Sequence, residues 1–418
     1  MINKDYSFLK QYYDIVLNTD KSTYKNSNDE PTPIGCIEEM LDKIPDSAWK
    51  KGAKILDPCC GNGNFHLYAY NKLKQKGVSH DEIISNNLFF NDINFERLQN
   101  VRDIYGKEAN VTLFDFLKYP EDEKYDIIYA NPPYAKFTKD NKRASKNHTM
   151  VRDFLSKSLK MLKKGGYLVY IIPNNWMSYA DRNLVISEIT SKQIVYLNIH
   201  GAKKWFPKIG SSFTWLVVQN LPAKKDYDVD CTYRGETHKD KVKGEERNFI
   251  PLLWTKKVQS IFSKTIEANN QKYNVQTSSD LHKYTKKELI RDKQDSEHTY
   301  RLIHTPKTTV WAKRPHKFQE GYKCFISTTD KYKTIVDNCG MTQSIAFIRC
   351  DDKKQADVVS KILNHDLYVF LNNLCRWGNF NNIRILQKFP IPKNPKDIYK
   401  SFGITKKEQE YIEKILKK

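Results

Sequence analysis

The first half of this chain predicts an α/β domain built on an open, doubly wound sheet, and the second half predicts a mixed α+β domain. Short apolar runs alternate with amphipathic stretches of helical period over roughly the first 220 residues, and the alternation then stops. The total of 418 residues also exceeds the usual size of one domain, about 100 to 200 residues. We therefore expect two domains with separate cores.

Seven apolar runs have the length and the bounding residues of buried strands: 53–56, 88–91, 111–114, 125–130, 167–172, 193–199 and 213–219. Between them lie four stretches with apolar residues at helical spacing: 65–76, 95–105, 150–162 and 176–189. The last two predicted strands are separated by a loop and not by a helix. We therefore expect them to form an antiparallel pair at one edge of the sheet.

The second domain is expected to begin at Pro222, because the regular alternation stops at Leu221-Pro222 and the run 224–228 has the polar composition of a linker. Beyond it, the pattern predicts a strand at 344–349 and helices at 355–374 and 406–417. We therefore divide the chain into residues 1–221 and residues 222–418.

Positive charge is concentrated in the second half of the chain. The whole sequence has 70 Lys and Arg against 49 Asp and Glu, a net charge of +21, and residues 221–418 alone have 39 against 24, a net charge of +15. Such an excess favours a polyanionic partner. A lysine-rich surface encoded by an AT-biased genome would give the same composition, so charge alone leaves both interpretations open.

Composition also bears on compartment and metal content. No window approaches the roughly 20 apolar residues of a membrane span, and residues 1–10 lack the apolar stretch of a signal peptide, so we expect a soluble, cytoplasmic protein. The eight cysteines include no CxxC pair, which predicts reduced thiols. Cys59 and Cys60 lie near His66, but adjacent cysteines lack ordinary ligand spacing, so we expect no metal site.

A glycine-containing turn follows the first predicted strand in the sequence ILDPCCGNGNF. Asp57 lies at the carboxyl end of the strand, and Gly61 and Gly63 would let a ligand approach the backbone closely. A dinucleotide fingerprint needs a third glycine where His66 stands, and no Gly-Lys-Ser/Thr follows, so NAD, FAD and a Walker A loop are disfavoured.

The next two predicted strands also end in acidic residues. Asp92, in FFNDIN, is placed to accept both hydroxyl groups of a ribose. Asp115, in LFDFL, could accept from an exocyclic amine, with Phe116 as an apolar ring beside it. One such acid is ordinarily a solvated strand end or a helix cap. Three acids in order favour a shared ligand.

The fourth predicted strand ends in an elbow of Asn131, Pro132, Pro133 and Tyr134. Its prolines remove two backbone donors and hold the chain extended. The Asn131 Oδ1 atom and the Pro132 carbonyl can then face one amino group as acceptors, while Tyr134 offers a flat face to a planar ring. Asn-Pro-Pro is also an ordinary turn, so the elbow indicates a substrate site only in combination with the motifs before it.

In order, DPCCGNGNF, ND, FDF and NPPY resemble the N6-adenine DNA methyltransferases of the gamma arrangement. The resemblance implies a Rossmann-like, seven-stranded, S-adenosylmethionine-dependent methyltransferase domain followed by a target-recognition domain. It covers residues 28–220 closely, through the Thr32-Pro33 segment and the later GGYLVYIIPNNWM and WFPKIGSSFTWLVVQN. Over residues 221–418 the resemblance is only general, and the segment NFNNIRILQKFPIP resembles the end of such a recognition domain.

The resemblance also implies roles for individual residues. The S-adenosylmethionine site would comprise Thr32, Asp57, Pro58, Gly61, Gly63, Asp92, Ile93, Asp115 and Phe116. The catalytic elbow would comprise Asn131, Pro132, Pro133 and Tyr134, and a flipped-out adenine would stack on Tyr134 and Phe206. Asn62 and Asn64 add side chains to a loop that is often richer in small residues, so the detailed contacts of the cofactor pocket stay open.

The implied activity is methyl transfer to adenine N6 in double-stranded DNA, for restriction-modification or epigenetic marking. The implied partners are double-stranded DNA and a separately encoded restriction endonuclease, with the chain as a monomer or homodimer. Three alternatives share the elbow: an RNA N6-adenine methyltransferase, a protein-glutamine methyltransferase, and an inactive nucleic-acid-binding protein. A basic region that follows the catalytic half favours DNA.

Two groups of residues are candidates for contact with DNA. The basic segment 136–148 follows the elbow at once and lacks apolar periodicity, which suits either a DNA-contacting loop or a surface loop without a role. In the second half the candidates are Arg314, Lys317, Arg376, Trp377 and Arg384. Any of these could contact phosphates or pack within the domain, so the target sequence is not readable from them.

Overall fold

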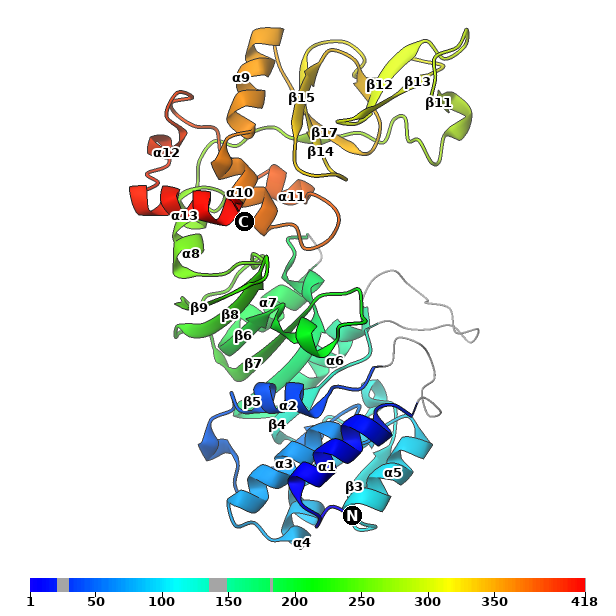
Figure 1. The fold of residues 1–418 in the computed structure, drawn as a ribbon, viewed down its shortest axis with the longest axis vertical. Helices are drawn as coiled ribbons and strands as arrows, with labels where there is room; N and C mark the ends of the chain where they lie inside the picture. Colours follow the sequence, from blue (N-terminus) through cyan, green and yellow to red (C-terminus); the bar gives the residue numbers. More distant parts are fainter. Residues whose placement is uncertain (21–29, 135–148, 181–182, 418) are drawn as a thin grey trace. The chain divides into compact units, whose positions relative to one another are not determined.

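The computed structural model describes residues 1–20, 30–134, 149–180 and 183–417. The chain divides into two compact units (Figure 1). The first unit comprises Met1–Trp176 and Arg182–Asn248, and the second comprises Met177–Asp181 and Phe249–Lys418.

The first unit is built on a nine-stranded sheet with the order β3-β2-β1-β4-β5-β7-β6-β8-β9. The first seven strands are β1 (Ile55–Asp57), β2 (Leu88–Asp92), β3 (Asn110–Leu113), β4 (Tyr125–Ala130), β5 (Leu162–Pro173), β6 (Lys192–Ile199) and β7 (Phe213–Pro222). Strands β1 to β5 pair in parallel, and β7 lies antiparallel between β5 and β6. This confirms the predicted α/β, Rossmann-like fold class.

The helices of this unit are α1 (Tyr6–Tyr12), α2 (Ile34–Leu41), α3 (Asn64–Gln75), α4 (His80–Glu82), α5 (Phe95–Tyr105), α6 (Thr149–Met161) and α7 (Leu184–Thr190). The predicted helices 65–76, 95–105 and 150–162 are confirmed, whereas α1, α2 and α4 were not predicted. Short π or 3-10 turns lie at Tyr13–Leu17, Asp46–Ala48, Ile83–Asn87, Phe116–Lys118, Asn174–Met177 and Gly201–Trp205. Of the helix predicted over 176–189, the described residues form a helix only at Leu184–Thr190, and residues 181–182 lie outside the described part of the chain. The buried Trp176 lies in the 3-10 turn Asn174–Met177 and donates its indole N–H to the Thr214 hydroxyl.

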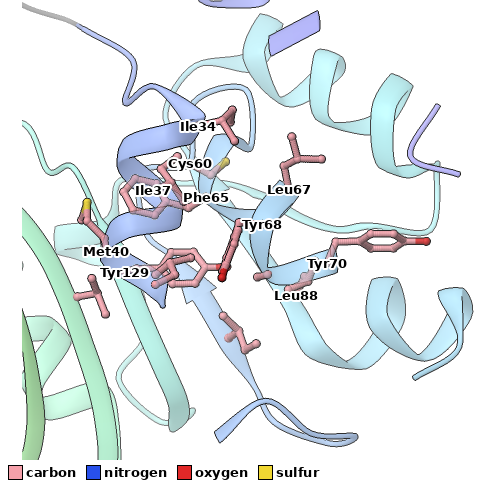
Figure 2. Packing of buried hydrophobic residues seen from close by; sticks show 14 of the residues in the cluster. Ile34, Ile37, Met40, Cys60, Phe65, Leu67, Tyr68, Tyr70, Leu88 and Tyr129 are labelled. Carbon is pink, nitrogen blue, oxygen red and sulfur yellow. The ribbon is translucent and has the colours of Figure 1, made fainter. Parts of the chain in front are cut away.

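Helices α2 and α3 both contribute side chains to one buried hydrophobic cluster of this unit (Figure 2). Ile37 on α2 and Phe65 on α3 belong to this cluster. The Phe65 ring in turn stacks on Tyr129 of β4, with ring centroids 5.3 Å apart. Aromatic pairs of this kind contribute about 0.5–1.5 kcal/mol beyond their buried area. The first turn of α3 is therefore packed against β4 near its carboxyl end.

The predicted domain boundary at residue 221 differs from the structural one. Strand β8 (Tyr227–Tyr233) pairs in parallel with β6, and β9 (Glu236–Val242) pairs with β8, so the sheet continues through the predicted linker 224–228. The β6–β7 pair is antiparallel as expected but is not at the sheet edge. The signal that the sequence analysis missed was a period of two, since Tyr227, Val229 and Cys231 are all buried.

The second unit is a mixed α+β structure, as predicted. One sheet has the order β10 (Gln276–Thr277), β17 (Ile345–Arg349), β14 (Lys323–Ser327), β15 (Thr334–Asp337), and the other β11 (Ile290–Arg291), β13 (Thr308–Ala312), β12 (Tyr300–Thr305), β16 (Gly340–Met341). Its helices are α8 (Lys256–Lys264), α9 (Lys353–Leu363), α10 (Asp366–Leu374), α11 (Ile383–Leu386), α12 (Ile398–Ser401) and α13 (Lys406–Lys417), with a 3-10 turn at Lys287–Leu289. The single helix predicted over 355–374 is two helices, because the His365 side chain caps α10.

The structural boundary sharpens the distribution of charge. Residues 249–418 have 32 Lys and Arg against 17 Asp and Glu, a net charge of +15, whereas residues 1–248 have 38 against 32, a net charge of +6. Residues 221–248, which include β8 and β9, have seven basic and seven acidic side chains and are neutral overall, so the excess belongs to the second unit. In the part of the chain that is described, no helix combines the length and apolar character that crossing a bilayer requires.

Candidate functional site

The carboxyl ends of β1 and β2 meet at the glycine loop, residues 57–64. The buried Asp57 accepts the Cys59 backbone N–H through Oδ1 at 3.1 Å. Asp92 at the end of β2 accepts the Gly61 N–H through Oδ2 at 2.8 Å and the Asn94 N–H through Oδ1 at 2.8 Å. The two predicted acids are thus brought to one loop, which positions both carboxylates at the same edge of the sheet.

The glycine loop requires its glycines. Gly61 and Gly63 have φ values of +53° and +85°, in the left-handed region that favours glycine. A Cβ atom at Gly63 would lie 3.0 Å from the Tyr105 ring, which already donates its hydroxyl to the Gly63 carbonyl at 2.8 Å. Tyr13 also donates to the Asn62 carbonyl at 2.9 Å. Two buried tyrosines therefore hold the loop from behind.

The two asparagines that depart from the family pattern have structural partners. Asn62 accepts from the Asn100 side chain at 3.1 Å. Asn64 donates through Nδ2 to the Asn18 side chain at 2.8 Å and to the Thr32 carbonyl at 3.0 Å. The Asn64 contact joins the glycine loop to the Thr-Pro segment, so this departure supports the pocket.

Thr32 and Asp57 are buried polar groups suited to a charged ligand. Thr32 is 3% exposed, and its hydroxyl has no hydrogen-bond partner among the described residues. Burial raises the pKa of the Asp57 carboxyl well above its usual range, and Asp92 adds to that increase. An ammonium or sulfonium group nearby would favour the ionised carboxylate. These residues fit the amino-acid end of S-adenosylmethionine.

At the end of β3 the exposed aromatic ring is not the one that the sequence predicts. Asp115 is exposed and caps the 3-10 turn Phe116–Lys118 by accepting the Leu117 N–H at 3.1 Å. Phe116 is 1% exposed and packs against Phe154, with ring centroids 5.2 Å apart. By contrast, Ile93 is 62% exposed and Phe114 43% exposed. Phe114, which the sequence analysis passed over, is therefore the exposed ring at this strand end.

Asn91 was also missed by the sequence analysis. Its side-chain amide donates to the Pro58 carbonyl at 2.9 Å and to the Phe114 carbonyl at 3.1 Å. One buried side chain thus ties together the residues that follow β1 and β3. Its position immediately before Asp92, in a strand buried on both faces, was the available signal.

The elbow after β4 has a defined amide orientation. The half-buried Asn131 donates through Nδ2 to the Glu30 carbonyl at 3.3 Å, and its Oδ1 accepts the Tyr134 hydroxyl at 2.6 Å. Pro132 is buried and Pro133 is exposed. The Cys59 thiol lies 3.6 Å from the Asn131 carbonyl, so the glycine loop and the elbow are in contact. The predicted DNA-contacting segment 136–148 lies outside the described residues.

The two rings predicted to stack on a base converge on a third ring. The Tyr134 and Phe213 centroids are 5.9 Å apart, and the Phe206 and Phe213 centroids are 5.5 Å apart. Phe206 is only 5% exposed. Phe213, the first residue of β7, is a member of this aromatic cluster that the sequence analysis did not select.

His66 is fully buried and has protein partners at both ring nitrogens. Its Nε2 lies 2.9 Å from the Phe89 carbonyl, which can only accept, so Nε2 carries the proton and Nδ1 accepts from the Tyr129 hydroxyl at 2.5 Å. Burial lowers the pKa of His66 to about 3. In the described part of the chain no three His, Cys, Asp or Glu side chains form a group that could hold a metal ion.

The DNA-contact candidates of the second unit have mixed surroundings. Exposed Arg314 pairs with Asp280 at 2.8 Å and, as the largest cause, lowers the pKa of Asp280 to about 2. Lys317 is exposed, and its backbone N–H also donates to Asp280. The other candidates are partly buried and bond within the unit: Arg376 to the Asn379 carbonyl, Trp377 to the Ile250 carbonyl and Arg384 to Gln387.

Comparison with known proteins identifies related sequences. Residues 44–206 match the family described as Eco57I restriction-modification methylase. The chain is 27% identical over 201 residues to the type II methyltransferase M.VspI of Vibrio sp. (strain 343), covering 44% of this chain and 46% of that protein. It is 25% identical over 250 residues to M.TthHB8I of Thermus thermophilus, covering 54% and 50%. The chain thus spans about half the length of these curated relatives.

Two solved structures resemble the fold of nearly the whole chain. The DrdV–DNA complex aligns with a TM-score of 0.54 at 10% identity, covering 99% of this chain and 59% of that one. The type ISP restriction-modification enzyme LlaBIII bound to DNA aligns with a TM-score of 0.52 at 12% identity, covering 98% and 40%. Residues 44–206 are thus similar to the Eco57I restriction-modification methylase family, and the likeness to the two solved structures concerns the fold.

Proposed function

We propose that this chain transfers a methyl group from S-adenosylmethionine to the N6 amine of an adenine flipped out of double-stranded DNA. The observation that carries the proposal is the contact between the two halves of the site. The elbow amide of Asn131 is oriented by the Glu30 carbonyl and Tyr134, and the Asn131 carbonyl lies 3.6 Å from the Cys59 thiol of the glycine loop. This contact supports a methyl-donor site and an acceptor site that lie next to each other.

The cofactor side would be held by residues at three strand ends. Thr32, Asp57, Gly61 and Gly63 would bind its amino-acid end, and Asp92, whose carboxylate lies at the end of β2 beside Gly61, its ribose hydroxyls. Pro58, Ile93 and Asp115 would surround its adenine together with the exposed Phe114, and Phe116 would join them only by separating from Phe154. When bound, S-adenosylmethionine supplies a methyl group already activated by its sulfonium.

The elbow supplies the substrate chemistry. An exocyclic amine is a weak nucleophile because its lone pair is delocalised into the ring. The Asn131 Oδ1 atom and the Pro132 carbonyl can accept its two hydrogens and favour a pyramidal nitrogen as positive charge develops. Tyr134 occupies one lone pair of Oδ1 and leaves the second for the amine. Because both Nδ2 and Oδ1 of Asn131 make hydrogen bonds, this acceptor would be positioned before the substrate binds.

The aromatic cluster would receive the base. Rotating an adenine out of the duplex costs a few kcal/mol. Stacking on aromatic side chains contributes about 1–3 kcal/mol per base, so contact with Tyr134 and Phe206 would offset much of that cost. Since both rings now lie against Phe213, binding would require at least one to separate from it.

The second unit is proposed as the target-recognition domain. Its net charge of +15 suits the DNA backbone, and phosphate contacts supply much of the affinity of DNA-binding proteins. Double-stranded DNA is the partner that this charge favours, and the two solved structures of similar fold are DNA complexes. A separately encoded restriction endonuclease is proposed as a second partner, and the chain is proposed to act as a monomer or a homodimer.

The test is methylation of several acceptors in parallel. Purified protein and labelled S-adenosylmethionine are incubated with unmethylated genomic DNA, with RNA or with a release factor, and the products are digested to nucleosides or peptides. We expect label in N6-methyladenine of DNA, at one short sequence that methylation-sensitive sequencing then maps. Label only in RNA or in methylglutamine would contradict the proposal, as would binding of DNA without transfer to any acceptor.

A further inference from the structure

We infer that Trp205 is a positioning residue that holds the target-base side of the site in register with the cofactor side. The inference rests on the proposed function, since it assigns Phe206 to the bound base. Its basis is that helix α2 and the residues just before it contact the glycine loop, the elbow and the turn that carries Phe206.

The segment before α2 contacts the first two of these. The Thr32 carbonyl accepts from Asn64 at the start of α3 at 3.0 Å, and the Glu30 carbonyl accepts from the catalytic amide of Asn131 at 3.3 Å. Three residues after Thr32, the helix reaches Gly35. The backbone that leads into α2 is therefore shared by the cofactor loop and the elbow.

The third contact is made by the Trp205 indole on one face of α2. A Cβ atom at Gly35 would lie 2.3 Å from Trp205 Cη2 and 2.8 Å from Cζ3, so only glycine leaves room for the ring. One turn further along, the Trp205 Nε1–H donates to the Glu39 Oε2 atom at 3.1 Å. The indole is therefore fixed in position by close packing and in rotation by a charge-assisted hydrogen bond.

The position of Trp205 determines the position of Phe206. The two residues are consecutive at the end of the 3-10 turn Gly201–Trp205, and the Phe206 N–H donates back to the Lys203 carbonyl at 3.2 Å. The Phe206 ring then meets Phe213, which also contacts Tyr134. A displacement of Trp205 on α2 would shift Phe206 relative to the elbow, and misplacement of a reacting group by about 1 Å can reduce a rate by about 100-fold.

The experiment compares three variants with the wild type. Trp205→Phe keeps a ring over Gly35 but removes the N–H to Glu39. Gly35→Ala fills the space that the ring occupies. Tyr6→Phe is the matched control. It removes the hydrogen bond that the Tyr6 hydroxyl donates, at 3.0 Å, to Glu38, which precedes Glu39 on α2. Tyr6 lies on α1 and not in the turn that carries Phe206. Each variant is measured for kcat, KM for DNA, Kd for S-adenosylmethionine, thermal midpoint, and fluorescence of 2-aminopurine at the target position of a duplex with the mapped site.

We expect Trp205→Phe to lower kcat by about tenfold and to reduce the 2-aminopurine signal, with the Kd for S-adenosylmethionine within about twofold of wild type. Gly35→Ala should have a larger effect of the same kind, and Tyr6→Phe should match the wild type. If Gly35→Ala does not fold, the kcat and 2-aminopurine signal of Trp205→Phe alone test the inference.

Unchanged kcat and fluorescence in Trp205→Phe would overturn the inference, as would parallel losses of thermal midpoint, cofactor binding and kcat. A wild type that methylates no DNA would instead contradict the proposed function.

Discussion

Asn131 is held by two hydrogen bonds that determine which of its atoms faces the substrate. With Nδ2 on the Glu30 carbonyl, Oδ1 is directed toward Tyr134. We expect Asn131→Ala to lower kcat by about 100-fold or more, which is the range seen when a preorganised polar group is removed. Calorimetry should show a Kd for S-adenosylmethionine near that of wild type, because Asn131 lies outside the glycine loop. Retained turnover would remove the elbow from the mechanism.

Tyr134 combines a ring and a hydroxyl whose contributions can be separated. Tyr134→Phe keeps the ring and frees the Asn131 Oδ1 atom, so we expect a change in kcat of only a few fold. Tyr134→Ala removes the stacking surface, which is worth about 1–3 kcal/mol, so KM for DNA should rise by about 10- to 100-fold. Steady-state kinetics on the mapped duplex check both. Equal losses in the two variants would mean that the hydroxyl, and not the ring, is the important group.

His66 makes the stability of the first unit depend on pH. Its pKa is about 3 in the folded protein and about 6.5 when unfolded, so the unfolded chain binds more protons between these values. The free energy of unfolding is therefore unaffected by His66 above about pH 6.5 and decreases as pH falls toward 3. At about pH 4.5 the decrease amounts to about 2–3 kcal/mol. Urea unfolding of wild type and His66→Gln at about pH 7.5 and 4.5 measures this. The variant should lose less stability on acidification, and an equal loss would contradict the prediction.

At the scale of elements, the glycine loop depends on backbone freedom at its second glycine. Gly63→Ala would place a side chain at φ +85° and 3.0 Å from the Tyr105 ring. Strain of this kind costs about 1–3 kcal/mol, and a displaced loop would alter the contact of Gly61 with Asp92. We expect a lower thermal midpoint and a weaker Kd for S-adenosylmethionine.

Gly77→Ala is the control, since it has a similar φ of +76° but lies after α3 with no atom within 4 Å of its added Cβ. It should lower the thermal midpoint without changing cofactor binding. Equal effects on cofactor binding in the two variants would show that the glycine loop has no special role.

Elements were predictable where their periodicity was local. The strands that end in Asp57 and Asp92, and the helices after them, follow from apolar spacing and turn residues. Strands β8 and β9 were missed because their alternation is dominated by charged residues, and only pairing with β6 identifies the buried side. Phe114 and Phe116 illustrate the same limit: which of the two rings is buried depends on Phe154 of α6, far along the chain.

For the whole molecule, charge separates the two units and predicts a strong dependence of DNA binding on salt. If several Lys and Arg of the second unit contact phosphates, the affinity for DNA should fall by at least about tenfold between about 50 mM and 200 mM salt. Fluorescence anisotropy with a labelled duplex measures the slope. Affinity that is independent of salt would contradict a binding surface dominated by phosphate contacts.

The sequence by itself determined the order of the motifs, the carboxyl-end position of each acid and the concentration of positive charge. These depend on local spacing, because parallel strands bring their carboxyl ends to one edge whatever else surrounds them. Only the tertiary structure decided that Glu30 orients Asn131, that Asn91 joins two strand ends, that Phe213 receives both stacking rings and that Trp205 lies on Gly35. Each of these is a contact between residues distant in the chain, which packing selects and no local pattern specifies.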